Sequence, residues 1–214
     1  CVFCPNRDVL RSDLPQGRMD LAAYCKIIDE LATLRPRRIS PYLMNEPLLD
    51  RRLPEFVHYA SERVPEATTL VTTNGTGLTE ELGAALLDAG LKRLKVSLQS
   101  LDPEVNRDLM GPGCDSGKVV ENVLAFKRLI KAKRARGFDL RVSMIVTRKN
   151  QDGIVATHRF WRRHGVRLVT SALENRGGNI GDAASLNPHA MATFRRGCVR
   201  PMREMCILWN GDAV

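Results

Sequence analysis

Residues 68–99, with the sequence TTLVTTNGTGLTEELGAALLDAGLKRLKVSLQ, contain the pattern that decides the fold. Thr and Val dominate the first six positions, 68–73, and such β-branched residues favour a strand. Residues 79–89 have the apolar spacing of a helix, and Gly90 stands where a helix commonly ends. Apolar and polar residues then alternate over 93–99, which predicts a second strand. A strand, a helix and a strand in about 30 residues indicate a parallel pair with a helical crossover.

The same alternation of strands and helices extends over most of the chain. Further strands are predicted at 38–44, 140–146 and 167–173, and further helices at 20–34, 53–63, 117–135 and 152–164, with Pro188 opening a last short helix. These segments form five βα-type repeats of about 25–40 residues each. We therefore predict an α/β domain with a parallel sheet, either open or curved into a barrel. In both geometries a ligand binds at the carboxyl ends of the strands.

Composition excludes several classes of protein. The chain has 214 residues, of which 43% are apolar and 5% aromatic. Such a chain can bury a sizeable core, and no apolar stretch approaches the ~20 residues that a membrane helix needs. Neither a G-x-G-x-x-G turn nor a Walker A loop follows a predicted strand. Nothing in the sequence therefore supports binding of a dinucleotide, or of a nucleotide in a P-loop.

The charge of the chain raises nucleic-acid binding as an alternative. Lys and Arg number 33 against 24 Asp and Glu, which gives a formal charge of +9. A basic stripe is the usual signature of a nucleic-acid-binding surface. Here the basic clusters interleave with helical apolar positions and lack stacking aromatic residues, which favours ordinary solvated helix faces.

Polar residues follow the predicted strands, at the edge where a ligand is expected. The segments are Met44-Asn45-Glu46-Pro47, Thr73-Asn74-Gly75, Ser97 with Gln99 and Ser100, and Glu174 to Asn179. The six cysteines include a C-x-x-C pair, Cys1 and Cys4, and a second pair, Cys198 and Cys206. Because the sequence shows no secretory signal, paired cysteines favour a metal or redox site over a disulfide framework.

Cys1-Val2-Phe3-Cys4-Pro5 and the strand-end segments together resemble radical S-adenosylmethionine (radical SAM) enzymes. The cysteine pair is similar to the last two cysteines of their C-x-x-x-C-x-x-C loop, whose first cysteine is expected four residues before Cys1. Met44-Asn45-Glu46-Pro47-Leu48-Leu49 resembles their GGEP segment, Thr72-Thr73-Asn74-Gly75 their TNG segment, and Ser97-Leu98-Gln99-Ser100 their SLDS segment. Zinc sites and redox pairs share the C-x-x-C spacing, so the resemblance depends on the whole ordered set.

The chain departs from the family pattern at two places. Met44 and Asn45 replace the two glycines that usually precede Glu46, although Asn tolerates a positive φ better than other non-glycine residues. Gln99 replaces the acidic residue of the fourth-strand segment. The turn before Glu46 is therefore expected to differ from that of the family.

The resemblance implies a 4Fe–4S cluster and SAM as cofactors. Cys1 and Cys4 are the implied cluster ligands, and three thiolates leave one iron open for SAM. The residues implied to contact SAM are Phe3 beside the adenine; Asn45, Glu46 and Pro47 in the segment that binds the methionyl amino group; Asn74 in the TNG segment; Ser97 or Gln99 at the ribose; and Arg176 at the SAM carboxylate or at an acidic substrate group. Asn74 and Gly75 also suit a simple strand-to-helix turn, and Arg176 equally suits an ordinary loop.

Two further cysteine assignments follow from the resemblance. Cys114, predicted to be an exposed loop residue, is a candidate hydrogen-atom donor. Cys198 and Gly211 are separated by 12 residues, which resembles the start of the SPASM or twitch extension of many radical SAM enzymes. The next cysteine of that extension is expected two residues beyond Val214, and Cys206 is an additional candidate ligand. Cys198 and Cys206 are thus implied metal ligands, with one or two auxiliary iron–sulfur clusters left open.

The resemblance implies a partial (β/α)6 TIM-like barrel without its first strand. Residues 1–185 are the expected radical SAM core, and residues 186–214 the expected linker and start of a SPASM/twitch domain. The implied enzyme is an oxidoreductase that cleaves SAM reductively to a 5′-deoxyadenosyl radical. That radical abstracts hydrogen from a peptide or from a sugar or aminocyclitol.

The implied electron donor is a flavodoxin or ferredoxin-type protein. A cytoplasmic location is expected, with no membrane or nucleic-acid partner. The alternative is a non-catalytic, zinc-stapled α/β module that binds nucleic acid with its basic faces.

Overall fold

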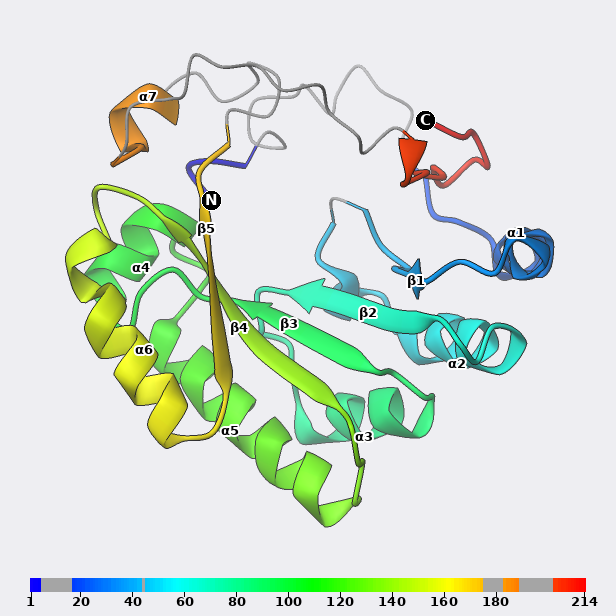
Figure 1. The fold of residues 1–214 in the computed structure, drawn as a ribbon, viewed down its shortest axis with the longest axis horizontal. Coiled ribbons are helices and arrows are strands. Elements are labelled where there is room, and N and C mark those ends of the chain that lie inside the picture. The colour runs from blue at the N-terminus through cyan, green and yellow to red at the C-terminus, as the bar shows by residue number, and fades with distance from the viewer. Residues whose placement is uncertain (5–16, 44, 175–182, 189–201) are drawn as a thin grey trace.

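The computed structural model describes residues 1–4, 17–43, 45–174, 183–188 and 202–214 (Figure 1). The strands are β1 (Arg38–Ile39), β2 (Thr68–Thr73), β3 (Arg93–Ser97), β4 (Asp139–Val146) and β5 (Arg167–Ala172). The α-helices are α1 (Leu21–Leu34), α2 (Leu53–Arg63), α3 (Glu80–Asp88), α4 (Pro103–Met110), α5 (Ser116–Ala132), α6 (Ile154–Arg163) and α7 (Ala183–Leu186), and the 3-10 helices are η2 (Pro47–Leu49) and η3 (Gln151–Gly153). None of the described helices is long and apolar enough to cross a membrane.

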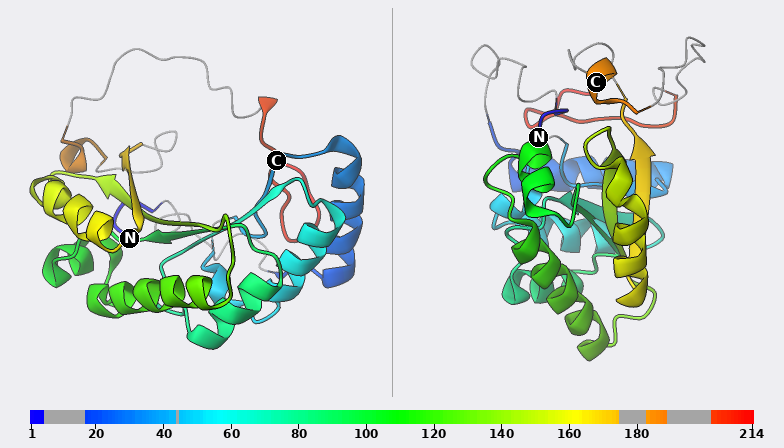
Figure 2. Two further views of the ribbon diagram at one scale, coloured as in Figure 1. Left: turned by 60° about the horizontal axis from the view of Figure 1, so that its bottom comes forward. Right: turned by 90° about the vertical axis from the view of Figure 1, so that its left-hand side faces the viewer.

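The five strands form one parallel sheet in chain order, β1-β2-β3-β4-β5. Figures 1 and 2 show α2, α3, α5 and α6 along the convex side of the curved sheet. Helical crossovers between adjacent parallel strands have one hand, so they all return on the same side of the sheet. The result is the predicted α/β fold, a curved parallel sheet of the kind that forms part of a barrel.

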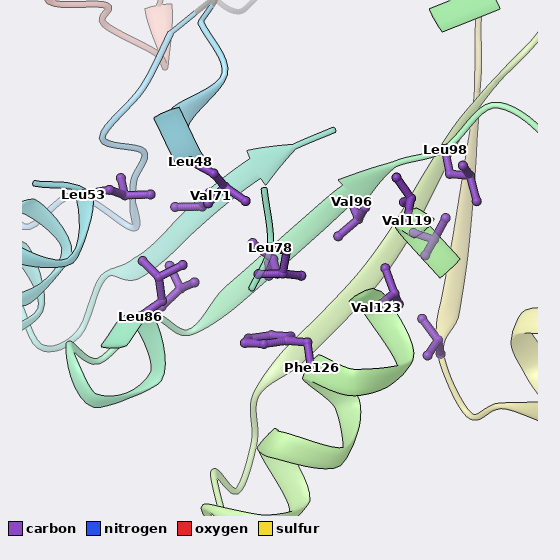
Figure 3. Close-up of a cluster of buried hydrophobic side chains, with 14 of the residues drawn as sticks. Leu48, Leu53, Val71, Leu78, Leu86, Val96, Leu98, Val119, Val123 and Phe126 are labelled. Carbon is purple, nitrogen blue, oxygen red and sulfur yellow. The ribbon is translucent and has the colours of Figure 1, made fainter. Parts of the chain in front are cut away.

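The convex face of the sheet packs against α3 and α5 in one apolar core. Alternate residues of β2, β3 and β4 are fully buried there, together with apolar residues of the two helices: Val71, Leu94, Val96, Val142, Leu86, Val119, Val123 and Phe126 (Figure 3). Burying each such side chain contributes roughly 1.5–3 kcal/mol. This interface therefore fixes the curvature and the register of the central strands.

Two elements differ clearly from the sequence prediction. β1 has two residues where a strand over 38–44 is predicted, because Pro41 has no N–H for strand pairing and Tyr42 turns back to donate to the Ser40 carbonyl at 2.8 Å. Helix α4 is absent from the prediction, although Asp102 caps it by accepting hydrogen bonds from two backbone N–H groups and Pro103 occupies its first turn.

The other elements agree with their predicted ranges to within a few residues. β2 has its predicted bounds. Helix α5 ends at Ala132 and not at 135, because Arg134 adopts a left-handed conformation with φ 51°. The helix predicted to open at Pro188 falls mainly outside the described residues, and α7 precedes it.

Gly75 makes the turn after β2 possible. Its φ is +79°, and an added Cβ would lie 2.6 Å from Val96 Cγ1 and 3.1 Å from Val119 Cγ1. Both the backbone conformation and the close approach to β3 and α5 therefore require glycine. Asn122 of α5 holds the same turn by donating to the Gly75 carbonyl at 2.9 Å.

Gly75→Ala is expected to lower the free energy of unfolding by about 1–3 kcal/mol, since it adds strain and a core clash. Chemical denaturation followed by circular dichroism measures this loss. Gly153→Ala is the matched control, because a Cβ there meets nothing within 4 Å. Equal stability of the two variants would contradict the conclusion that the turn after β2 requires glycine at position 75.

Asp139 ties together the amino ends of β3 and β4. Its carboxylate accepts hydrogen bonds from Arg93 Nε at 2.7 Å, from Arg141 Nε at 2.7 Å and from Arg141 Nη2 at 2.5 Å. These bonds, above all those of Arg141, lower the pKa of Asp139 although desolvation opposes the shift. The ionised carboxylate is thus the form that the folded state favours.

Asp139→Asn is expected to cost about 1 kcal/mol of stability at pH 7. Because the folded pKa lies below the unfolded one, the contribution is complete above about pH 4 and is lost as pH falls through the folded pKa. Urea unfolding across pH 2.5–7 should show the wild type and the variant converging at the acid end. Asp152→Asn, at an exposed position, should leave stability unchanged within about 0.5 kcal/mol throughout.

Candidate functional site

Glu46 joins the loop after β1 to the carboxyl end of β2. Thr73 Oγ1 donates to its Oε1 at 2.5 Å, and the backbone N–H of Asn74 donates to its Oε2 at 2.7 Å. The N–H of Leu48 donates to Oε1 at 3.2 Å, so Glu46 also caps η2. A carboxylate has about four lone-pair sites, and three are used here. One acceptor site remains for a ligand.

Asn74 lies at the same edge of the sheet. Its Oδ1 accepts from the N–H of Thr76 at 2.9 Å and from the Thr76 hydroxyl, which closes the predicted turn. Asn45 is exposed, whereas Pro47 is buried in the first turn of η2. Of the residues implied to contact SAM in this loop, Asn45 is therefore accessible to a ligand and Pro47 is buried.

Gln99 is the centre of a buried amide network at the carboxyl ends of β3 and β4. Its side-chain oxygen accepts a hydrogen bond from the backbone N–H of Ile145 at 2.8 Å, and the backbone N–H of Gln99 donates to Asn106 Oδ1 at 3.1 Å. Asn150 Nδ2 donates to the carbonyls of Gln99 and Ile145, both at 2.9 Å. Only 3% of Gln99 is exposed, so a cofactor-facing role is confined to its amide nitrogen. Ser97 lies two residues before Gln99, at the end of β3. It is half-buried and lies on the opposite face of the strand from Val96.

Asn106 and Asn150 are site residues that the sequence analysis missed. Asn106 is fully buried and donates from Nδ2 to the Cys114 carbonyl at 2.9 Å. Asn150 Oδ1 accepts from the N–H of Thr147 at 2.8 Å. Their signal in the sequence is weak, because Asn106 lies in helix α4, which the sequence analysis did not predict, and Asn150 suits an ordinary turn equally well. Only the fold shows that Asn106 holds the end of β3 to the loop at Cys114 and that Asn150 holds the ends of β3 and β4 together.

The loop of Cys1 to Cys4 docks on the same side of the sheet. The N–H of Val2 donates to the Leu109 carbonyl at the end of α4 at 2.9 Å, and Cys4 N–H donates to the Cys1 carbonyl at 3.1 Å. Phe3 is 7% exposed and packs with Leu109 and Leu173. The ring therefore anchors the loop between α4 and the end of β5. Cys1 is exposed and Cys4 half-buried, and neither forms a disulfide.

Cys114 is buried, which corrects the prediction of an exposed loop thiol. It is 7% exposed, with Sγ 3.7 Å from Asn106 Nδ2 and 3.8 Å from Met110 Sδ. The loop between α4 and α5 folds inward because Asn106 binds the Cys114 carbonyl. Burial raises the pKa of the thiol, the hydrogen bond from Asn106 opposes this shift, and the carboxylates of Asp115 and Glu46 add to it. Cys114 thus lies close enough to Glu46 for that carboxylate to affect the thiol.

Three predicted residues at the carboxyl-terminal part of the chain have different outcomes. Arg176 and Cys198 lie outside the described residues. Cys206 is half-buried in a hairpin, where its N–H and carbonyl bond to Val214 at 3.2 and 2.8 Å. The hairpin turns at Gly211, which has φ +90°, and an antiparallel bridge joins Ile207 and Ala213. Among the described residues no three Cys, His, Asp or Glu side chains group closely enough to hold a metal ion.

Glu46→Gln tests the link between the loop and β2. Either orientation of the new amide places an NH2 group against a backbone N–H, of Leu48 or of Asn74, so a loss of about 1–3 kcal/mol is expected. Thermal and urea unfolding measure it. The control Glu66→Gln removes the same charge at an exposed position and should be neutral. If the two variants unfold alike, Glu46 does not hold these segments together.

The sequence profile described as "Radical SAM superfamily" matches residues 1–170. Among curated relatives, a GTP 3′,8-cyclase of Aquifex aeolicus is 34% identical over 167 residues, which cover 78% of this chain and 47% of the relative. An S-adenosyl-L-methionine-dependent 2-deoxy-scyllo-inosamine dehydrogenase of Niallia circulans is 35% identical over 98 residues, covering 45% of this chain and 38% of the relative. The chain thus spans less than half the length of these relatives.

A solved structure of SuiB from Streptococcus suis, bound to its precursor peptide SuiA, has a similar fold. The TM-score is 0.66 at 18% identity, over 84% of this chain and 38% of SuiB. At this identity the similarity concerns the arrangement of strands and helices alone. It agrees with a curved parallel sheet whose carboxyl edge carries the residues described above.

Proposed function

Because the chain belongs to the radical SAM superfamily, we propose that the protein is an enzyme that binds a 4Fe–4S cluster and SAM at the carboxyl edge of its sheet. The placement of the cysteine loop, Glu46 and Gln99 at this edge supports the proposal, since ligands of parallel α/β sheets bind there. When bound, the cluster would supply the electron for reductive cleavage of SAM, and the resulting 5′-deoxyadenosyl radical would abstract hydrogen from the substrate.

Cys1 and Cys4 are the proposed cluster ligands in this chain. Thiolates are the ligands that iron–sulfur clusters require, so the donor chemistry fits. The two residues lie in one turn that Phe3 and the Val2–Leu109 hydrogen bond hold against the barrel. Among the described residues no third possible ligand groups with these two cysteines, so we propose that the third thiolate lies outside them.

The proposed SAM contacts use the groups that the internal network leaves open. Glu46 has one acceptor site left, suited to the methionyl ammonium group. The amide nitrogens of Asn74 and Gln99 and the Ser97 hydroxyl can bond ribose oxygens. Asn45 is proposed to offer its backbone beside them, Pro47 shapes the loop, and Phe3 is proposed to lie beside the adenine. Arg176 is proposed for the SAM carboxylate.

The carboxyl-terminal residues are proposed to begin a second module. We assign residues 1–185 to the core and residues 186–214 to a linker and the start of a SPASM/twitch domain, with Cys198 and Cys206 as ligands of an auxiliary cluster. The hairpin around Gly211 supports this division, because that extension places a glycine at the corresponding position. The buried thiol of Cys114 stays a candidate hydrogen-atom donor, since its raised pKa keeps the S–H bond intact.

The substrate is proposed to lie over the concave face of the sheet. Relatives and structural neighbours include enzymes named for a nucleotide, an aminocyclitol and a peptide. A peptide and a sugar or aminocyclitol are the classes implied by the sequence motifs. Reduction requires an external donor of the flavodoxin or ferredoxin type, which suits the expected cytoplasmic location.

Anaerobic reconstitution of the full-length protein tests the enzyme proposal. Iron, sulfide and SAM are added, dithionite reduces the protein, and 5′-deoxyadenosine is measured by chromatography. Wild-type protein is expected to bind iron and release 5′-deoxyadenosine, whereas Cys4→Ala should lose both. Cys25→Ala removes a thiol on α1 and should change neither. An intact cluster without 5′-deoxyadenosine would show that the proposal is wrong.

The alternative, a zinc-stapled module that binds nucleic acid, predicts a different result in the same preparation. Purified protein would contain zinc in place of iron, and its nucleic-acid affinity would fall steeply with salt. The superfamily match over residues 1–170 favours the enzyme.

A further inference from the structure

The side-chain amide of Gln99 is held in one orientation. Its Oε1 accepts a hydrogen bond from the backbone N–H of Ile145 at 2.8 Å. A flipped amide would place its NH2 group against that N–H, and two donors would then face each other at a buried position. The carboxyl edge of the sheet therefore presents the Nε2 donor of Gln99 to a ligand, and not its oxygen.

Both backbone polar groups of Gln99 bind the side chains of buried asparagines. Its N–H donates to Asn106 Oδ1 at 3.1 Å, and its carbonyl accepts from Asn150 Nδ2 at 2.9 Å. Asn106 belongs to α4, whereas Asn150 follows β4. Because Gln99 lies two residues beyond the end of β3, these two side chains hold its backbone where the strand has already ended.

Asn150 connects the same two residues that the Gln99 side chain joins. Its Nδ2 donates to the carbonyls of Gln99 and Ile145, both at 2.9 Å. Its Oδ1 accepts from the N–H of Thr147 at 2.8 Å and from Thr147 Oγ1 at 3.1 Å. These four bonds fix the Asn150 amide in turn, because a flip would place its oxygen against the two carbonyls.

A simple turn does not account for all of these contacts. The bonds from Thr147 to Asn150 Oδ1 would close a turn after β4 by themselves, as Asn side chains commonly do. The Nδ2 group reaches beyond that turn to Gln99, which lies 51 residues earlier in the chain. Asn150 therefore determines how the backbone of Gln99 lies relative to β4, and with it the position of the Gln99 amide.

We propose that Asn150 is a positioning residue of the SAM site that acts through Gln99. By holding the Gln99 and Ile145 carbonyls together, Asn150 directs the Gln99 NH2 group toward an acceptor atom of bound SAM. This inference rests on the proposed function, which places SAM at the carboxyl edge. Because Asn150 is only 3% exposed, its contribution to SAM affinity comes through the geometry of Gln99 and not through direct contact.

A double-mutant cycle on the reconstituted full-length protein tests this role. Anaerobic equilibrium dialysis without a reductant measures the dissociation constant of SAM, and iron content is measured in parallel. Asn150→Asp keeps the shape of the side chain but places a carboxylate oxygen against two carbonyls, so about tenfold weaker SAM binding is expected at unchanged iron content. Gln99→Ala should also weaken SAM binding, and the double variant should bind SAM no more weakly than Gln99→Ala alone.

Thr69→Val is the matched control at the opposite end of the sheet. Thr69 is fully buried, and its hydroxyl donates to the Gly90 carbonyl at 3.1 Å and accepts from the N–H of Lys92 at 3.1 Å. The substitution thus removes buried hydrogen bonds between β2 and the turn before β3. It should lower the midpoint of urea unfolding, as Asn150→Asp should, while SAM binding stays at the wild-type level.

Each outcome decides the proposal. Weaker SAM binding in Asn150→Asp that disappears in the Gln99→Ala background supports it. Wild-type affinity in Asn150→Asp, equal weakening in Thr69→Val, or additive losses in the double variant overturns it. Asn150→Ala, which adds no charge, provides the same comparison if Asn150→Asp does not fold. Failure of the wild type to bind SAM refutes the proposed function, whereas SAM binding that is indifferent to Asn150 refutes this inference alone.

Discussion

The rest of the structure depends on one constraint: β2, β3 and β4 pair in parallel, and the resulting sheet packs against α3 and α5. The crossovers return on one side, so half of the strand residues are buried beneath helices and the other half face the concavity. The same pairing brings the carboxyl ends of the strands to a common edge. The site follows from this single arrangement.

Side-chain hydrogen bonds hold that edge where regular structure ends. Glu46 fixes the loop after β1 to β2, and Gln99, Asn106 and Asn150 fix the ends of β3 and β4. Such buried polar groups are costly unless they are paired, so the network tolerates few alternative geometries. The network thus fixes the geometry of the edge through the protein's own hydrogen bonds, which favours precise placement of a reactive group.

Periodicity predicted most of the fold because it reports which residues are buried. The strand at 68–73 and the helix at 53–63 have the predicted bounds, since their apolar patterns are strong and local. β1 is shorter than predicted because Pro41 has no N–H for strand pairing. The loop at Cys114 folds inward because Asn106 donates a hydrogen bond to the Cys114 carbonyl. Long-range contacts of this kind leave no periodic signal, so the prediction of an exposed Cys114 failed.

The sequence by itself determined the α/β class, the order of the repeats, and the chemistry of the strand-end residues, because hydrophobic period and residue type are local properties. Tertiary structure alone decided which of these residues meet and which are already used. Glu46 accepts three hydrogen bonds from within the protein. The side-chain oxygen of Gln99 also accepts one, so only its amide nitrogen is available to a cofactor. Only the fold placed the amide of Asn150 against the carbonyl of Gln99, because residues far apart in sequence become neighbours through strand pairing.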